Sequence, residues 1–168
     1  DLRGEGSHPA LAFLLGARDA FRYPPDPDAP PLLSLAASPL FHISGLHACA
    51  ITAVASGLGH VWTTGRFDAE KILRLTEQYG ITRWSGVTTQ VWRIIEHPKL
   101  GEYDTSSVTS IGGGGSVWSP ELQEACRRAL PHVEVTVSVG YGLTECSGLA
   151  THAGSDLLLQ HPDTVGQP

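Results

Sequence analysis

Methionine is absent from this sequence, including from position 1. A natural protein begins with methionine, so we expect these residues to be an internal segment, a processed product or a trimmed piece of a longer protein. Cysteine is also scarce. The three cysteines, Cys49, Cys126 and Cys146, are far apart and odd in number, which fits reduced intracellular thiols better than a disulfide framework or a zinc site.

Long apolar runs and clustered basic residues are lacking as well. No stretch is apolar over the length that a bilayer requires, and the N-terminus lacks the basic and then apolar layout of a secretory signal. We therefore expect no integral membrane segment and a cytoplasmic location. Lysine and arginine number 11 against 17 acidic residues, and they are scattered. A nucleic-acid partner would require a clustered basic face, so we expect none. The oligomeric state stays open.

Helical and strand patterns alternate along the chain without an internal repeat. A first expected helix begins near Ser7 and Pro9 and is followed by a proline-rich run at residues 24–31. This alternation predicts an α/β fold with a largely parallel sheet, right-handed crossovers and flanking helices. The expected strands cover residues 32–37, 60–64, 81–87, 108–111 and 133–139; the further helices cover residues 43–56, from an Asp68 cap to 79, from a Thr88 cap to about 97, and from Ser119 to 130.

The run VGYGLTE, which ends at Glu145, brings together residue types that suit a nucleotide and its metal. Tyr141 offers a planar face on which a base can stack. The flanking Gly140 and Gly142 let the main chain approach a ligand closely. Thr144 can donate to a phosphate oxygen, and Glu145 supplies the hard oxygen ligand that phosphate-bound Mg²⁺ takes from proteins. A glycine-punctuated turn with a solvated Glu145 explains the local composition equally well.

Two glycine-rich runs, residues 112–116 and 140–142, each follow an expected strand. Ligands gather beyond the carboxyl ends of strands in open α/β sheets, so we expect both runs to be loops beside a ligand. A dinucleotide-binding oxidoreductase does not fit, because GxGxxG cannot be read in any register of the first run. A serine hydrolase does not fit either, because the sequence has no GxSxG elbow.

Four motifs, in this order, resemble the adenylate-forming superfamily of acyl-CoA synthetases, luciferases and peptide-synthetase adenylation domains. They are PLFHISG at residues 39–45, IGGGGS at 111–116, YGLTE at 141–145 and TVGQP at 164–168. The resemblance runs from about Ser7 to the last residue. It implies that residues 1–168 are an internal part of the larger N-terminal AMP-binding domain, and that the ligands are ATP, Mg²⁺, coenzyme A and a small-molecule carboxylic acid.

The resemblance also implies a role for individual residues. His42 would lie near the acid's carboxylate and the thiol tunnel, and His42, Thr144 and Glu145 would be the catalytic residues. A lone histidine after a strand is otherwise more often structural. Tyr141, between Gly140 and Gly142, would stack on adenine, Thr144 would bond phosphate, Glu145 would hold Mg²⁺, and Gly114, Gly115 and Ser116 would line the adenine edge through their main chain.

Departures from the family's pattern bear on the substrate. The His42 segment has no aspartate, and amino-acid-activating relatives typically carry one there. We therefore expect a fatty or aromatic acid rather than an amino acid. Val117 and Trp118 stand where relatives show proline and a small aliphatic residue, and Thr88 stands where proline is common. Trp118 either reshapes the acyl pocket or packs in the core.

Segments that the family needs for catalysis are missing from the sequence. They are the upstream loop rich in Ser, Thr and Gly that grips phosphate, and a C-terminal domain bearing a lysine. The leading interpretation is a fragment of an acyl-CoA synthetase that is inactive by itself. The alternatives are an acyl-adenylating enzyme that loads a carrier protein and a nucleotide-binding remnant without catalysis.

Overall fold

The computed structural model describes residues 32–56, 58–131, 136–146 and 148–168. The helix expected near Ser7, the proline-rich run and the first part of the strand expected at 133–139 lie outside the described residues. No helix within the described part is long and apolar enough to cross a bilayer. The strands are β1 (Leu33–Ala36), β2 (Gly59–Trp62), β3 (Arg83–Ser85), β4 (Ser110–Gly114), β5 (Thr136–Leu143) and β6 (Gly148–Ala153).

These strands form one sheet in the order β2-β1-β3-β4-β5-β6. All neighbouring pairs are parallel except β5 and β6, which are antiparallel. The α/β fold with a largely parallel sheet is therefore confirmed. The helical segments are α2 (Ile43–Gly45), η1 (Leu46–Ile51), α3 (Thr52–Ser56), α4 (Ala69–Tyr79), α5 (Thr88–Ile95), η2 (Leu100–Glu102), α6 (Pro120–Ala129), η3 (Thr144–Cys146) and α7 (Ser155–Gln160).

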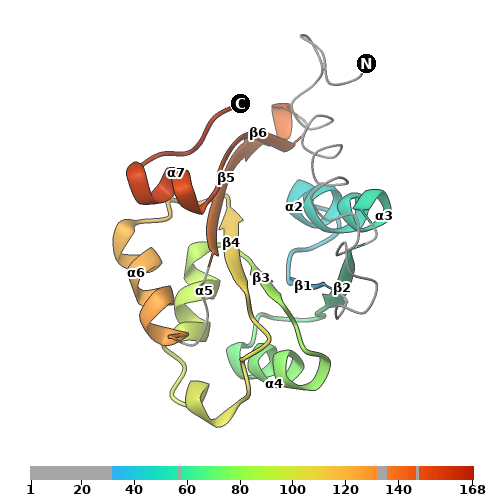
Figure 1. The fold of residues 1–168 in the computed structure, drawn as a ribbon. Coiled ribbons are helices and arrows are strands. Elements are labelled where there is room, and N and C mark those ends of the chain that lie inside the picture. The colour runs from blue at the N-terminus through green and yellow to red at the C-terminus, as the bar shows by residue number, and fades with distance from the viewer. Residues whose placement is uncertain (1–31, 57, 132–135, 147) are drawn as a thin grey trace.

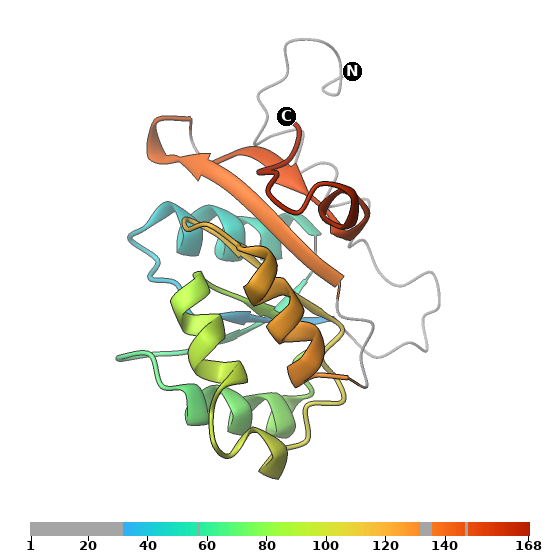
Figure 2. The same ribbon diagram turned by 90° about the vertical axis from the view of Figure 1, so that its left-hand side faces the viewer.

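One face of the sheet carries the hydrophobic core. Figure 1 shows α5 and α6 on this side and α2 with α3 on the other, and Figure 2 shows α5 and α6 lying side by side over the strands. Trp84 of β3 is buried in this core, and its indole N–H donates to the Thr76 hydroxyl of α4 at 2.9 Å. Burial of such apolar side chains is the main source of stability. The fully buried members include Leu35, Ile72, Leu73, Trp84, Val91, Ile94, Ile111 and Leu122.

Helix ends follow the expected signals with one exception. The Asp68 carboxylate accepts from the Lys71 N–H at 3.2 Å, and Gly80 ends α4 with φ of 64°. The residue that caps α5 is Val87, so the prediction of a Thr88 cap was wrong by one position. Val87 has an extended backbone and Thr88 is the first helical residue, whose N–H donates to the Ser116 hydroxyl.

The single buried helix expected at residues 43–56 is wrong in two respects. It is divided into α2, the π-helix η1 and α3, and Val54 is 90% exposed. The Thr52 hydroxyl donates to the His47 carbonyl at 2.9 Å, which gives the wider π turn a partner that an α-helix would not need. The run of small residues predicted the helix but not its local register.

The C-terminal part of the sheet is longer than expected. β5 continues to Leu143 rather than ending at Val139, and it turns through η3 into β6. Neither β6 nor α7 was predicted, because their sequences show no clear period of two or 3.6. The hairpin places η3 beyond the end of the sheet.

Candidate active site

The direction of the crossovers changes between β1 and β3, and this determines where the sheet can hold a ligand. β1 is followed by α2 on one face, whereas the neighbouring β3 is followed by α5 on the opposite face (Figure 1). The two helices therefore lie on opposite faces of the sheet beyond the carboxyl ends of these strands. Such a switch point is the usual ligand site of open α/β sheets. His42 follows β1, and Val87 and Thr88 follow β3, so both segments border it.

The YGLTE run lies at the same edge, at the end of β5. Tyr141 is still part of the strand and is 46% exposed, so its ring is accessible to a planar ligand. Thr144 and Glu145 are exposed in the short η3 turn. The turn is closed by the Cys146 sulfur, which accepts from the Leu143 N–H at 3.3 Å and donates toward the Leu143 and Gly148 carbonyls. Cys146 therefore has a structural role in this turn.

Glu145 offers a single exposed carboxylate to a metal ion. Among the described residues, no group of three His, Cys, Asp or Glu side chains comes together as a ligand set. Mg²⁺ bound to a nucleotide takes one or two carboxylates from protein and its other ligands from phosphates and water. The donor set at this turn therefore fits Mg²⁺ carried by a nucleotide, and it does not fit a metal held by the protein alone.

The loop after β4 forms the neighbouring wall of the site. β4 ends at Gly114, and Gly115 begins the loop with φ of 77°, a left-handed conformation that glycine adopts readily. Ser116 is exposed, and its hydroxyl accepts from the Thr88 N–H at 3.1 Å. The Ser116 hydroxyl therefore has a structural partner in α5. The Ser116 main chain lies at the carboxyl edge of the sheet, where a ligand could contact it.

The expectation that both glycine-rich runs are loops was wrong for most of their length. Residues 112–114 lie within β4 and residues 140–142 within β5, and the pairing of β5 with β6 shifts register between Tyr141 and Gly142. A Cβ on Gly113 would collide with the carbonyl oxygen of Gly86, and one on Gly142 with that of Gly148. These glycines are needed because neighbouring backbone approaches them closely. The sequence pattern alone does not distinguish this requirement from close contact with a ligand.

His42 is exposed at the start of α2. Its Nδ1 lies 2.8 Å from the Ser44 hydroxyl and accepts from the Ser44 N–H at 3.2 Å, so the imidazole caps the helix. The remaining ring nitrogen, Nε2, is the atom that a substrate would meet. His42 follows β1 at the carboxyl edge of the sheet, and its catalytic role remains a prediction.

A second histidine, His47, lies near the η3 turn. A Cβ built on Gly148 would lie 3.5 Å from the His47 Nδ1, and Gly148 has φ of 127°. Gly148 pairs with Leu143, directly below the turn that carries Glu145. The π-helix η1 thus packs against the base of the hairpin. No sequence signal pointed to His47, because this contact joins segments about 100 positions apart.

Trp118 packs in the core rather than in a substrate pocket. It is 4% exposed and belongs to the same cluster as Leu122 and Val139. Its indole N–H is buried and has no hydrogen-bond partner among the described residues. The core-packing alternative for Trp118 therefore agrees with the structure.

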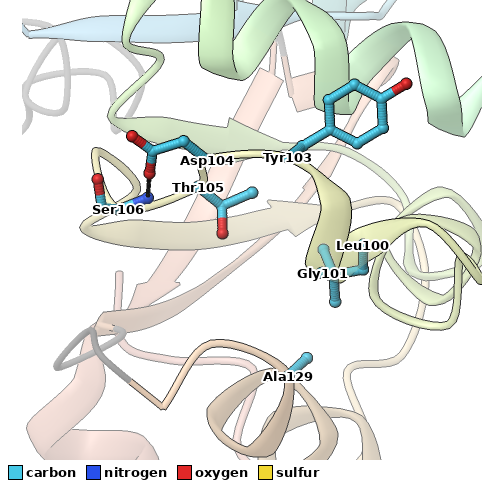
Figure 3. Close-up of a pocket in the computed structure, with 7 residues that line it drawn as sticks. All are labelled: Leu100, Gly101, Tyr103, Asp104, Thr105, Ser106 and Ala129. Carbon is cyan, nitrogen blue, oxygen red and sulfur yellow. Dashed lines mark hydrogen bonds between the residues drawn. The ribbon is translucent and has the colours of Figure 1, made fainter.

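A cavity of about 360 Å³ opens near the opposite end of the strands. Figure 3 shows Tyr103, Asp104, Thr105 and Ser106 around it, with the Ser106 N–H donating to the Asp104 carboxylate at 2.9 Å. These residues precede β4 in the chain, and none of the predicted site residues lines the cavity. It is therefore separate from the candidate active site.

The family model of the AMP-binding enzymes matches residues 10–168 of this chain. The chain therefore belongs to the AMP-binding enzyme family. It is 32% identical over 107 residues to a 4-coumarate–CoA ligase of Humulus lupulus, which covers 64% of this chain and 19% of the ligase. It is 30% identical over 146 residues to an acyl-CoA synthetase of Caenorhabditis elegans, which covers 87% of this chain and 26% of the synthetase. The chain thus spans about a fifth to a quarter of these relatives.

Solved structures share the fold. An O-succinylbenzoate coenzyme A synthetase of Bacillus subtilis, in complex with ATP and magnesium ion, matches with a TM-score of 0.74 and 23% identity. The match covers 95% of this chain and 30% of that enzyme. The N-terminal domain of a Mycobacterium tuberculosis protein, FACL13, matches with a TM-score of 0.70 over 83% of this chain and 34% of that domain.

Proposed function

We propose that this chain is part of an acyl-CoA synthetase, in which it supplies one wall of an adenylate-forming site. The observation that carries the proposal is the placement of Tyr141, Thr144 and Glu145 at the end of β5, at the same sheet edge as the β1–β3 switch point. Family membership supports a nucleotide as the ligand of that edge. On this proposal residues 1–168 are a partial AMP-binding domain.

The proposed reaction has two steps. A carboxylate oxygen of the acid attacks the α-phosphorus of ATP, the bond from that phosphorus to the pyrophosphate oxygen breaks, and pyrophosphate leaves. The thiolate of coenzyme A then attacks the acyl carbonyl, and AMP leaves as the thioester forms. Each step brings anions together, so positioning and neutralisation of charge dominate catalysis.

On this proposal, the residues of this chain orient the nucleotide and the acid. The Tyr141 ring would stack on adenine, the main chain of Gly114, Gly115 and Ser116 would follow the base edge, and the Thr144 hydroxyl would donate to a phosphate oxygen. Glu145 would hold Mg²⁺, which when bound supplies positive charge against the phosphates. The Nε2 of His42 would face the acid.

The acid is expected to be fatty or aromatic, and the expected compartment is the cytoplasm. Aspartate is absent from residues 39–45, which argues against an amino acid. The 4-coumarate and acyl-CoA ligases among the relatives support a carboxylic acid of this kind and coenzyme A as the acceptor.

Glu145→Gln in the full-length protein tests the proposal. We expect acid-dependent exchange of pyrophosphate into ATP to fall by roughly a hundredfold or more, because the carboxylate would lose its charge toward Mg²⁺. Glu102→Gln, an exposed change in η2 away from the site, should leave exchange unchanged. Undiminished exchange in Glu145→Gln would remove this residue from the mechanism.

Two further assays separate the alternatives. Formation of free acyl-CoA by the full-length protein distinguishes a coenzyme A ligase from an enzyme that loads a carrier protein. Binding of ATP without exchange for any acid identifies a nucleotide-binding remnant. We also propose that residues 1–168 alone do not form acyl-adenylate at a useful rate, and carboxylate-dependent exchange by the purified fragment would contradict this.

A further inference from the structure

The base of the β5–β6 hairpin lies against the helical segment that follows His42. Gly148, the first residue of β6, pairs with Leu143, the last residue of β5. A Cβ built on Gly148 would lie 3.5 Å from the His47 Nδ1 and 3.8 Å from two side-chain carbons of Ile43. These are ordinary contact distances, so the two side chains bound the space beside Gly148.

His47 and Ile43 reach the hairpin from one side of the helical segment. Residues four positions apart lie about one turn from each other on the same face of a helix. The same segment holds His42 by its main chain, because the His42 carbonyl accepts from the Leu46 N–H at 3.0 Å. The segment that begins with His42 and the hairpin that carries Glu145 are therefore in direct contact.

The backbone of His47 is fixed by two hydrogen bonds to its carbonyl. Both come from Thr52, one from its N–H and one from its hydroxyl, the latter at 2.9 Å. The N–H bond spans five residues and closes the π turn of η1, a feature that is frequent at functional sites. Thr52 is buried. His47 takes part in a further interaction as well, so its place does not depend on the contact with Gly148 alone.

The turn above this contact is closed by weak hydrogen bonds. Glu145 is exposed in η3. Within the described part of the turn, the Cys146 sulfur accepts from the Leu143 N–H at 3.3 Å and donates to the Gly148 carbonyl at 3.2 Å. Because thiol hydrogen bonds are weak, the position of the turn depends on the base of the hairpin, where Gly148 meets the helical segment.

We propose that His47 is a positioning residue of the adenylate-forming site. It holds the base of the hairpin in place, so that Thr144 and Glu145 keep a fixed position relative to His42. This inference rests on the proposed function and adds a residue to the same site. His47 acts through Gly148 rather than through contact with the nucleotide or the acid.

Loss of this contact should weaken nucleotide binding more than acid binding. A turn that is free to move must be ordered when MgATP binds, and the ordering lowers affinity. His42, which is proposed to face the acid, is held by a different contact, because its Nδ1 accepts from the Ser44 N–H at 3.2 Å. The two ligands should therefore respond differently to a change at His47.

His47→Ala in the full-length protein tests this difference. We expect the dissociation constant of MgATP, measured by titration calorimetry, to rise by roughly threefold to tenfold, the effect of ordering one or two groups. The KM for the acid in pyrophosphate exchange should change by less than about twofold. His47→Asn should recover most of the affinity, because its amide places a polar atom close to where Nδ1 lies. His161→Ala, an exposed change after α7, is the matched control.

Hydrogen–deuterium exchange follows the turn without any reaction. The Leu143 N–H donates to the Cys146 sulfur, so its exchange reports whether the turn is closed. In the absence of substrates we expect faster exchange at Leu143 in His47→Ala and unchanged exchange in α4. Should His47→Ala fail to fold, Ile43→Val, which removes one of the two carbons near Gly148, should show the same changes at smaller size.

A double-mutant cycle with Cys146→Ala separates positioning from general stability. Both residues act on Gly148, His47 from the helical segment and Cys146 from the turn. Changes that share a partner are not additive. The effect of the pair on the MgATP dissociation constant should therefore differ from the product of the single effects by about threefold or more. Combined with Ser106→Ala at the distant cavity, the effect of His47→Ala should stay the same.

The outcomes separate this inference from the proposed function. An unchanged dissociation constant and unchanged exchange at Leu143 in His47→Ala would overturn the role of His47 and leave the proposed function standing. Equal losses for MgATP and acid, without recovery in His47→Asn, would show a structural role only and would overturn it as well. Absence of both MgATP binding and pyrophosphate exchange in the unaltered protein would overturn the proposed function itself.

Discussion

The backbone N–H of Thr88 donates to the Ser116 hydroxyl, with 3.1 Å between nitrogen and oxygen. Thr88 is the first residue of α5 and Ser116 belongs to the loop after β4, so one hydrogen bond joins two neighbouring crossovers at the edge where the candidate active site lies. It also satisfies one of the backbone donors that the first turn of a helix leaves without an internal partner.

Ser116→Ala removes this link. We expect the free energy of unfolding to fall by about 0.5–1.5 kcal/mol, the net value of a typical hydrogen bond. The KM for ATP should rise severalfold, because the loop after β4, which is proposed to line the edge of the adenine, loses its hydrogen bond to α5. Denaturant unfolding and exchange kinetics on the full-length protein measure both effects. Ser106→Ala, at the distant cavity, is the control, and an unchanged KM in Ser116→Ala would show that the loop position does not depend on this bond.

Gly113 should tolerate no side chain. Gly113→Ala places a methyl group against the Gly86 carbonyl oxygen within paired strands. We expect the free energy of unfolding to fall by about 1–3 kcal/mol, as it does when a well-packed core is overfilled. Gly101→Ala in η2 is the matched control, because no atom lies within 4 Å of the added methyl. Its effect should be within about 0.5 kcal/mol. Thermal or urea unfolding of both variants decides the point, and equal stabilities would contradict the close strand approach.

Several elements were predictable because their signals are local. Asp68 and Gly80 mark the ends of α4, and Ser119 with Pro120 opens α6, since capping and φ preferences act within a few residues. The alternation of elements likewise predicted the largely parallel sheet.

The remainder depends on contacts between distant segments. Glycine is disfavoured in strands, so residues 112–114 and 140–142 were expected in loops, and only the neighbouring backbone explains their place in β4 and β5. The π turn of η1 depends on the Thr52 hydroxyl, and the approach of His47 to Gly148 depends on the hairpin. Local periodicity contains none of this information.

Stability should decrease on mild acidification. Burial lowers the pKa values of both His60 and His152 below 6.5, so below that pH the unfolded chain binds more protons than the folded one. The two neutral imidazoles therefore contribute fully to the free energy of unfolding above about pH 6.5 to 7, and this contribution is lost as the pH falls.

Melting temperatures of the full-length protein at pH 7.5 and 5.5 test this dependence. The double variant with His60→Gln and His152→Gln should lose less stability between these pH values than the parent. His161→Gln, an exposed change after α7, should behave like the parent. A double variant with the parent's full pH dependence would show that other groups cause it.

The three cysteines should differ in reactivity. Burial raises the pKa of Cys126 to about 12, so almost none of it is the thiolate that alkylating agents require. Burial also raises the pKa of Cys49. Cys146 is only half-buried, so brief iodoacetamide treatment of the native protein, followed by peptide mass spectrometry, should label it first. Labelling of Cys126 at a similar rate would indicate that the core opens readily.

The Cys146 sulfur makes three hydrogen bonds within the described part of the turn that carries Glu145. Thiol hydrogen bonds are weak, and those of Cys146 are made at 3.2 to 3.3 Å to main-chain atoms of Leu143 and Gly148. Little free energy therefore opposes a change in the turn's shape, while β5 and β6 below it pair as antiparallel strands with one register shift. A nucleotide would have to order this turn as it binds, and part of its binding energy would be spent on that ordering.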